Sequence, residues 1–519
     1  MKRVLMVLFF IMGMLVFGAK DEIVVNFEYE PYESNLDPQL GIDLDINALI
    51  MEGLIRQDEK GKPVPGIAEK WEISEDGLVW TFHLRDAKWE NGDYVTANDF
   101  KFAWIRALES ENAAEYSYLL FLIKGAYEYN GGAGSIEEIG IRVIDDKTLE
   151  ITLDTPTKYL DSLLTFPVYI PLNEKYYKSN KNGYAKDAGK IMANGSYKLL
   201  SWIHHDELVL EKNENYWNKN KIKNEIIRAK LIENASDSLR AFENNEIDFT
   251  ILTVEQYSKF REDKRLTTYD DGSTWYLEYN LNNVFLSNKK IRQALTMVVD
   301  KEELGNILQA MGKPAYGFVP DTIMGENKTF REEAGETYPR YNSKKARELF
   351  KEGMKELGLE KAPKVTLIFN DQGNNKKISE YVQKKIKKEL GYDLTIEPLP
   401  FEERLVKMLG KDFDIVLAGW IGDYNDALSY MDLWITNGGN NHTSYSNPKY
   451  DELIQIAQTS PCQKVRMQAM IEAEKLLGDD MPIGMLYYRR KIVLINPRLK
   501  NMKFKSLGSI YYLNDAYVK

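Results

Sequence analysis

The chain has 519 residues, more than one hydrophobic core normally holds, since single cores stop growing near ~250–300 residues. Its formal net charge is −11 and it carries no basic run, which excludes the electrostatic footprint of a nucleic-acid-binding protein. The only cysteine is Cys462, so a disulfide within the chain is excluded. We expect Cys462 to be an ordinary loop or helix-start residue.

The N-terminus has the layout of a secretory signal. Two basic residues precede an apolar stretch over 4–17, and the small pair Gly18-Ala19 follows it. The stretch is shorter than the about 20 residues that a membrane span needs, and its flanks fit a signal peptide over 1–19. A membrane anchor is the alternative. Because no cysteine stands at the cleavage site to receive a lipid, we expect a soluble mature protein in the periplasm.

The first long stretch of the chain is rich in strand patterns. Residues 79–84 and 149–153 alternate apolar and polar positions, which is typical of half-buried strands. Between them, Thr96 and Asp99 form a capping box that predicts the start of a helix. The glycine-rich segment 131–135 predicts a loop.

Later in the chain, helical patterns alternate with short apolar strands. Helices are expected at 289–299 after Asn288, 344–357 after Ser343, 376–390 and 402–409, the last two with left-handed stops at Gly391 and Gly410. Strands are expected at 365–369, 394–396 and 413–417. This alternation predicts an α/β protein with a mixed sheet and helices packed on it. The pattern alone does not give the lobe boundaries.

The sequence signatures of enzymes and metal sites are missing. There is no Gly-x-Ser-x-Gly elbow, no phosphate loop and no His-Glu-x-x-His. The chain has four histidines, and the adjacent His204 and His205 would point to opposite faces of a strand, so they cannot readily share a metal. We therefore expect no catalytic residue, no cofactor and no metal.

The most informative segment is 418–426, which reads AGWIGDYND and follows the apolar strand over 413–417. Free backbone can pair with a peptide main chain, aromatic rings can cover it, and a carboxylate can hold its ammonium group. The alternatives are a turn-forming aspartate beside Gly422 and aromatic rings that belong to the core. The residues predicted to bind the ligand here are Gly419, Trp420, Ile421, Asp423 and Tyr424.

This segment resembles the AGW-x-x-DYN-[ED] motif of the extracytoplasmic oligopeptide-binding proteins, the solute receptors of peptide ABC importers. They form the peptide/nickel-binding class of solute-binding protein family 5. Other motifs of the same family follow one another along the chain, which is not expected by chance. They are LDP at 36–38, EGL at 52–54, WTFHLR at 80–85, WENGDYVTANDF at 89–100, NGSYKL at 194–199 and PAYG at 314–317.

The resemblance implies a two-lobed fold of the periplasmic-binding-protein type II, with mixed sheets, a hinge and an extra inserted subdomain. It implies a discontinuous lobe I made of 20–50, 172–272 and 490–519. The inserted subdomain would be 51–171 and lobe II would be 273–489. Two crossings would then join the lobes, as closure around a ligand requires.

The resemblance also assigns roles to single residues. It makes Asp423 the group that captures the amino terminus of the ligand. The motif Y-x-E-x-N falls on Tyr276, Glu278 and Asn280, which share one face of a strand and either line the cleft or tie the hinge strands together. The other ligand-binding candidates are Phe401, Tyr116 with Tyr118, and Asp43.

One departure from the family pattern concerns the far end of the ligand. Some relatives place basic residues or histidine around the ligand carboxylate, whereas this chain has Asn375, Met408 and Leu417 at the matching positions. The remaining basic candidates are Arg331, Arg340 and Lys328. The sequence does not decide among them.

We therefore predict a monomeric periplasmic receptor that captures oligopeptides between closing lobes and delivers them to an inner-membrane ABC permease. It would have no nucleic-acid partner and would do no chemistry on its cargo. The alternatives are a receptor for dipeptides, murein peptides, oligosaccharides or nickel on the same fold, or a chaperone-like peptide-binding protein. Peptide length and sequence preference are not determined by the sequence.

Overall fold

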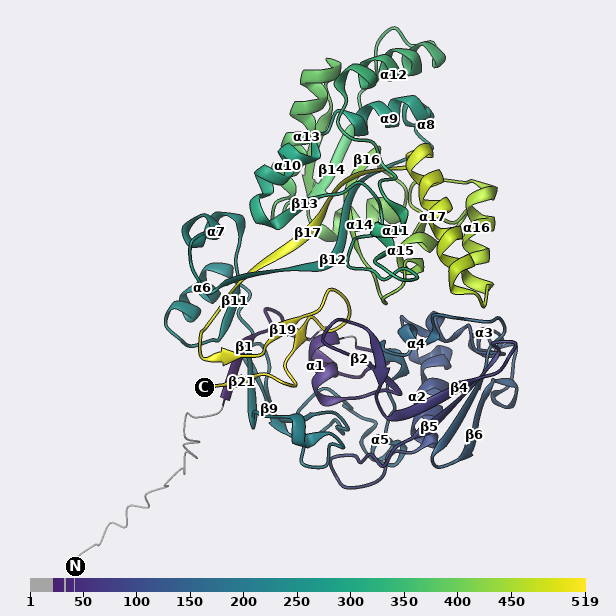
Figure 1. Ribbon diagram of the computed structural model, residues 1–519, viewed down its shortest axis with the longest axis vertical. Helices are drawn as coiled ribbons and strands as arrows, with labels where there is room; N and C mark the ends of the chain where they lie inside the picture. The colour runs from purple at the N-terminus through teal and green to yellow at the C-terminus, as the bar shows by residue number, and fades with distance from the viewer. Residues whose placement is uncertain (1–21, 32–33, 42) are drawn as a thin grey trace, which may run out of the picture.

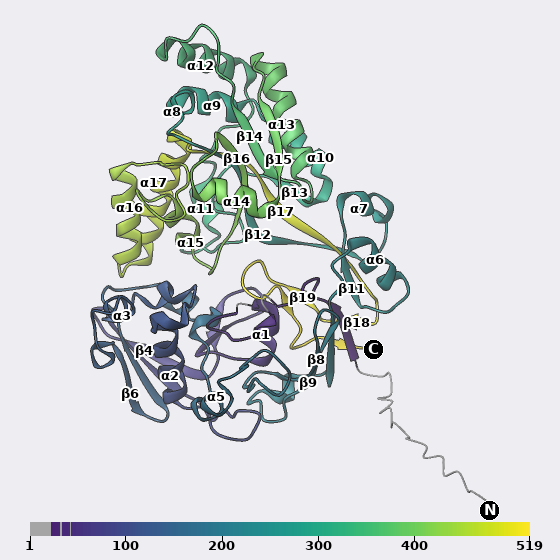
Figure 2. The ribbon, with the colours of Figure 1, turned by 180° about the vertical axis from the view of Figure 1, so that it is seen from behind.

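The computed structural model describes residues 22–31, 34–41 and 43–519, so the predicted signal peptide over 1–19 lies outside the described residues. In Figure 1 the protein has a lower and an upper part, joined by two long strands, β12 (Leu266–Tyr279) and β17 (Ile483–Ile495). The view from behind in Figure 2 shows the same division. None of the helices in the described ranges combines the length and apolarity needed to cross a bilayer.

The lower part contains two sheets of four strands in the described chain. The first has the order β1-β10-β9-β8, and its first strand joins it in parallel from the start of the chain. The second has the order β4-β5-β7-β6, all antiparallel. The strands are β1 (Glu22–Asn26), β4 (Ala68–Ile73), β5 (Val79–Leu84), β6 (Ile141–Asp145), β7 (Thr148–Thr152), β8 (Tyr197–Ile203), β9 (Glu207–Lys212) and β10 (Ile226–Lys230).

The sequence predictions for this part are confirmed with small shifts. β5 has the predicted bounds, and β7 begins one residue earlier than predicted. The capping box of Thr96 and Asp99 opens helix α2 (Ala97–Leu108), whose buried Trp104 stacks edge-on against Tyr169. One hydrophobic cluster runs from the first sheet to the second, so the two sheets share a core.

The upper part is built on a mixed sheet with the order β11-β17-β12-β16-β14-β15, and β13 lies beside β17. β12 runs antiparallel to both its neighbours, whereas β14 is parallel to β15 and β16. This confirms the predicted mixed sheet. The strands not yet given are β11 (Phe249–Ile251), β13 (Gly312–Pro314), β14 (Thr366–Asn370), β15 (Thr395–Leu399) and β16 (Ile415–Ile421).

Helices cover the upper sheet and enclose a second hydrophobic cluster, which contains Leu277, Tyr279 and Trp434. The helices are α8 (Val284–Ser287), α9 (Lys289–Met297), α10 (Lys301–Leu308), α11 (Phe330–Ala334), α12 (Ser343–Glu356), α13 (Asn375–Leu390), α14 (Phe401–Leu409), α15 (Leu428–Met431), α16 (Pro448–Thr459) and α17 (Gln463–Asp480). The lower part adds α1 (Leu44–Ile50), α4 (Leu160–Leu163) and other short segments.

The ends of these helices test the capping predictions. The Asn288 side chain caps α9 as predicted, but α12 is capped by Asn342, one residue before the predicted Ser343. Gly391 ends α13 in the left-handed conformation as predicted. The same prediction for Gly410 is wrong, because its φ is −76° and the next residue, Lys411, takes the left-handed conformation instead.

The two connecting strands pair with each other on both sides of an irregularity. β12 and β17 lose their register between Asp270 and Thr274, and Gly272 within this gap has a φ of 66°. The predicted crossings at 272–273 and 489–490 both fall inside these strands. The assignment of whole segments to lobes stays a prediction.

We expect Gly272→Ala to lower the free energy of unfolding by about 3 kcal/mol. A Cβ at this position would lie 2.5 Å from the Ser506 carbonyl oxygen, and the left-handed conformation adds strain for any L-residue. Urea denaturation measures the change. Gly373→Ala is the control, since Gly373 is also left-handed but its Cβ would meet nothing within 4 Å. Equal losses for the two variants would contradict the role of the close contact.

Candidate functional site

The loop after β16 is folded back onto the strand that precedes it. The Gly422 amide donates to the Tyr430 hydroxyl at 3.1 Å, and the Asp423 amide donates to Ser429 Oγ at 2.7 Å. The Trp420 indole donates to the Ser429 carbonyl at 2.8 Å. These bonds fix the backbone that carries Asp423 at the rim of the upper sheet.

The carboxylate of Asp423 is half-buried and free. Among the described residues it forms no hydrogen bond and no ion pair, and burial raises its pKa to about 6. Asp426, three residues later, differs because it binds the Arg466 guanidinium at 3.0 Å through each oxygen. Asp423 is therefore an anion without a cation, which is costly unless a ligand supplies one.

The same loop touches the lower part. Tyr424 is buried and stacks on Tyr159, which precedes α4, with ring centroids 5.7 Å apart. The Arg466 guanidinium lies over the Tyr159 ring, 4.7 Å from its centroid. The Asn425 side-chain amide donates to the Gly61 carbonyl at 3.2 Å. The upper and lower parts are thus in contact beside Asp423.

Tyr116 of the lower part also lies near Asp423. Its ring packs on Tyr118 and on Phe166, with centroids 5.9 and 4.8 Å away. Burial, and after it the negative charge of Asp423, raise the pKa of Tyr116 to about 12. The fold therefore brings together two predicted site residues that are far apart in the sequence.

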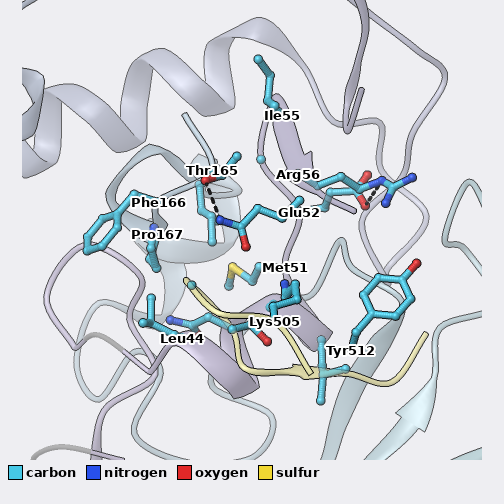
Figure 3. Close-up of a pocket in the computed structure, with 18 of the residues that line it drawn as sticks. Leu44, Met51, Glu52, Ile55, Arg56, Thr165, Phe166, Pro167, Lys505 and Tyr512 are labelled. Atoms are coloured by element: carbon cyan, nitrogen blue, oxygen red, sulfur yellow. Dashed lines mark hydrogen bonds and ion pairs between the residues drawn. The ribbon is translucent and has the colours of Figure 1, made fainter. Parts of the chain in front are cut away.

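Asp423 lines a cavity together with residues of the lower part. Figure 3 shows this cavity with lining residues of the lower part labelled. Its walls come from α1 and the residues after it, from the segment over 164–170, and from the C-terminal segment over 505–514. The sequence did not predict these residues as a site, although the EGL motif over 52–54 includes some of them. Sequence periodicity reports neighbours within one element and cannot show which distant segments come together in the fold. The side chains labelled in Figure 3 include Leu44, Glu52, Arg56, Phe166, Lys505 and Tyr512.

β16 has a free edge next to Asp423. One edge pairs with β12 along its whole length, but β14 pairs only with Ile415 and Val416. Residues 417–421 therefore have no strand partner on the second side within the described structure. Leu417 and Ala418 are buried, whereas Gly419 and Ile421 are exposed. The small size of Gly419 has a packing reason, since a Cβ there would lie 2.7 Å from the Trp275 ring. An extended chain could pair with this edge.

The sequence predicts that Tyr276, Glu278 and Asn280 either line the cleft or tie the hinge strands together, and their part in ligand binding stays a prediction. All three are buried, with exposures of 3%, 2% and 6%. Tyr276 packs edge-on against Trp434, and the Asn280 amide donates to the Phe413 carbonyl at 2.7 Å. These contacts support the structural alternative, although ligand contact itself is untested.

Two other candidates, Phe401 and Asp43, are not among the residues that line the cavity. Phe401 begins α14 and is 45% exposed, but it lines a separate hollow with Gln372 and Pro398. The Asp43 carboxylate caps α1 by accepting from the Ile46 amide at 2.8 Å, and burial raises its pKa to about 7. Their roles in ligand binding stay predictions. In the described ranges, no group of three His, Cys, Asp or Glu is placed to hold a metal.

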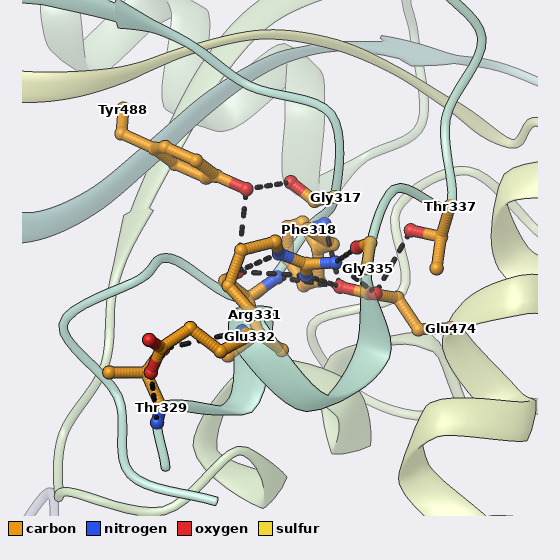
Figure 4. Close-up of polar contacts among 10 residues, drawn as sticks. Gly317, Phe318, Thr329, Arg331, Glu332, Gly335, Thr337, Glu474 and Tyr488 are labelled. Carbon is orange, nitrogen blue, oxygen red and sulfur yellow. Dashed lines mark hydrogen bonds and ion pairs between the residues drawn. The ribbon is translucent and has the colours of Figure 1, made fainter.

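Two of the three basic candidates for the ligand carboxylate, Arg331 and Arg340, are already engaged. The Arg331 guanidinium binds Glu474 and the Val319 carbonyl (Figure 4). Arg340 pairs with Glu336 on the surface. The Arg331 donors therefore serve the interior of the upper part, and a contact of Arg331 with the ligand stays a prediction.

Residues 62–442, more than half of the chain, match the family described as "Bacterial extracellular solute-binding proteins, family 5 Middle". Among curated relatives, the oligopeptide-binding protein OppA of Bacillus subtilis is 34% identical to this chain. The match covers 96% of this chain and 93% of the relative. The dipeptide-binding protein DppE of the same organism is 32% identical and covers 94% of this chain and 90% of its own.

A solved structure shares the fold along almost the whole chain. It is the structure described as Listeria monocytogenes OppA bound to peptide, which is 32% identical in sequence. The match covers 96% of this chain and 99% of that chain, with a TM-score of 0.79.

Proposed function

This chain belongs to the bacterial extracellular solute-binding proteins of family 5, and we propose that it captures oligopeptides between its two lobes for an ABC permease. The relatives named for oligopeptide binding and the peptide-bound neighbour support this proposal. The observation that carries it is the unpaired Asp423 carboxylate beside the free edge of β16. A peptide offers both an ammonium group and an extended main chain.

The Asp423 carboxylate and the free edge of β16 would bind different parts of the peptide. The Asp423 carboxylate holds the peptide ammonium in a site shielded from water, where the pair is stronger than at a surface. The edge over 417–421 pairs with the peptide main chain, which is the same for every sequence. Affinity then depends little on the side chains, and the tyrosines around Tyr116 cover the amino-terminal end.

The lobes close by bending the two connecting strands. Lobe I would comprise 20–50, 172–272 and 490–519, with the inserted subdomain 51–171 packed on it, and lobe II would comprise 273–489. The contacts of Tyr424 with Tyr159 and of Asn425 with Gly61 support a closed arrangement. A monomer exported by its signal peptide to the periplasm, without a lipid anchor, would carry the peptide to the permease without hydrolysing it.

Native mass spectrometry of the purified protein tests this function. We expect a ladder of retained peptides, because a shielded amine site and a free strand edge accept many sequences. Only two-residue masses would favour dipeptide cargo instead, as in the relative named for dipeptides. A hexose series or a bound metal would contradict the proposal.

A further inference from the structure

The cavity beside Asp423 also contains an unpaired cation. Lys505 lines it and is 7% exposed, and among the described residues its ammonium donates no hydrogen bond and joins no ion pair. Figure 3 shows Lys505 among the side chains around the cavity. By contrast, Arg56 on the same wall is paired with Glu52 at 3.8 Å.

The surroundings of Lys505 do not neutralise it. Burial lowers its pKa to about 8, while the attraction of Asp45 opposes this and the charge of Arg56 adds to it. The Asp45 carboxylate already accepts from the Ile510 and Tyr511 amides at 2.7 and 3.2 Å. A buried ammonium without a partner is unfavourable, so an anion from a ligand would be stabilised here.

A second polar group of the cavity also has no partner. Asn47 of α1 lines the cavity and is fully buried, and neither its amide nitrogen nor its amide oxygen is hydrogen-bonded to any residue that the structure describes. Buried amides in folded proteins nearly always have a partner. Two unsatisfied groups that line one cavity indicate a site built for a polar ligand rather than a packing gap.

We propose that Lys505 receives a carboxylate of the bound peptide, in the cavity that Asp423 also lines. This inference rests on the function proposed above. It accounts for the absence of basic residues at Asn375, Met408 and Leu417, because the cation comes from the C-terminal segment instead. The carboxylate is either the peptide C-terminus or the side chain of an Asp or Glu residue.

Calorimetry with matched peptides tests the proposal and separates these two sources. The first series contains peptides of two to five alanines, each with a free or an amidated C-terminus. The second series contains amidated peptides in which one alanine is replaced by Glu or by Gln. In the wild type, the carboxylate member of at least one pair is expected to bind about 30-fold or more tightly than its neutral partner.

Lys505→Met should abolish this preference and leave the affinity for the neutral partner unchanged. Lys503→Met is the matched control, because Lys503 is paired with Glu59 and does not line the cavity. Melting temperatures monitor folding, and Lys505→Met is expected to melt no lower than the wild type because a buried charge is removed. A preference that disappears only in the C-terminal pairs assigns the C-terminus, and one that disappears only in the Glu and Gln pairs assigns a side chain.

Two results would overturn the inference. One is an equal loss of affinity for charged and neutral peptides in Lys505→Met, which would indicate a structural lysine. The other is a carboxylate preference that persists in Lys505→Met or is absent from the wild type. In either case the peptides still bind, so the proposed function survives. If the wild type binds none of the peptides, the proposed function itself fails.

Discussion

Replacing Asp423 by Asn is expected to weaken the binding of peptides with a free amino terminus about 100-fold or more. The amide keeps the shape of the side chain but loses the charge that holds the ammonium, and truncating one member of a buried charge pair costs about 2–5 kcal/mol. Calorimetry with a peptide retained by the purified protein measures the effect. Asp412→Asn, an exposed change just before β16, should bind as the wild type does.

An acetylated peptide separates amine capture from a general loss of structure. Acetylation should cost the wild type about as much as the Asp423→Asn substitution, and the two changes together should cost little more than either alone. Additive losses would show that Asp423 does not meet the amine. The acid side of the pH profile is a second test. Because the pKa of free Asp423 is about 6, affinity should fall below pH 6 in the wild type but stay level in the variant.

The same substitution should stabilise the unliganded protein at pH 7. Burial raises the Asp423 pKa from 3.8 to about 6, so the folded state binds this proton more tightly than the unfolded state. The resulting stability is fully present below pH 3.8 and is lost as the pH rises through 6. At pH 7 the free energy of unfolding of the variant should therefore be about 2 kcal/mol higher than that of the wild type. Lower stability of the variant at pH 7 would contradict an unpaired carboxylate.

Replacing Glu474 by Gln is expected to lower the free energy of unfolding by about 3–5 kcal/mol. Glu474 is fully buried in α17 and accepts from the Phe318 and Val319 amides at 2.8 and 2.9 Å, as well as from Arg331. Removing its charge leaves the Arg331 guanidinium buried without a counter-ion. Thermal denaturation should show a loss of roughly 10 °C in the transition of the upper part.

Two further variants test this explanation. Glu472→Gln changes an exposed residue of the same helix and should alter stability by less than about 0.5 kcal/mol. Combining Arg331→Met with Glu474→Gln should recover much of the loss, because no unpaired charge remains and the amide oxygen can still accept from Phe318 and Val319. A single Glu474→Gln variant as stable as the wild type would show that the pair contributes no net stability.

Local patterns predicted the elements of the fold well where the cause was local. The capping box at Thr96, the cap at Asn288 and the glycine stop at Gly391 are confirmed, because each depends on a few neighbouring residues. Gly410 failed as a left-handed stop because the chain turns one residue later, at Lys411. Glycine permits that conformation without requiring it.

The candidate site was predictable only in part. Alternation placed Tyr276, Glu278 and Asn280 on one face of a strand but could not show that all three are buried. The ion pair between Arg331 and Glu474 could not be predicted either, since these residues lie far apart in the chain. Charge and hydrogen-bond partners are properties of neighbours in space, which periodicity does not report.

The sequence by itself determined the family, the mixed α/β fold and the position of Asp423 at the end of a buried strand. It did so because motifs and strand patterns are local. Only the tertiary structure decided that the Asp423 carboxylate is unpaired while Asp426 is bound to Arg466. It also decided that Lys505, from the last segment of the chain, borders the same cavity. The physical reason is that the partners of a charged side chain come from distant parts of the chain, and only the fold determines which of them lie close enough to pair with it.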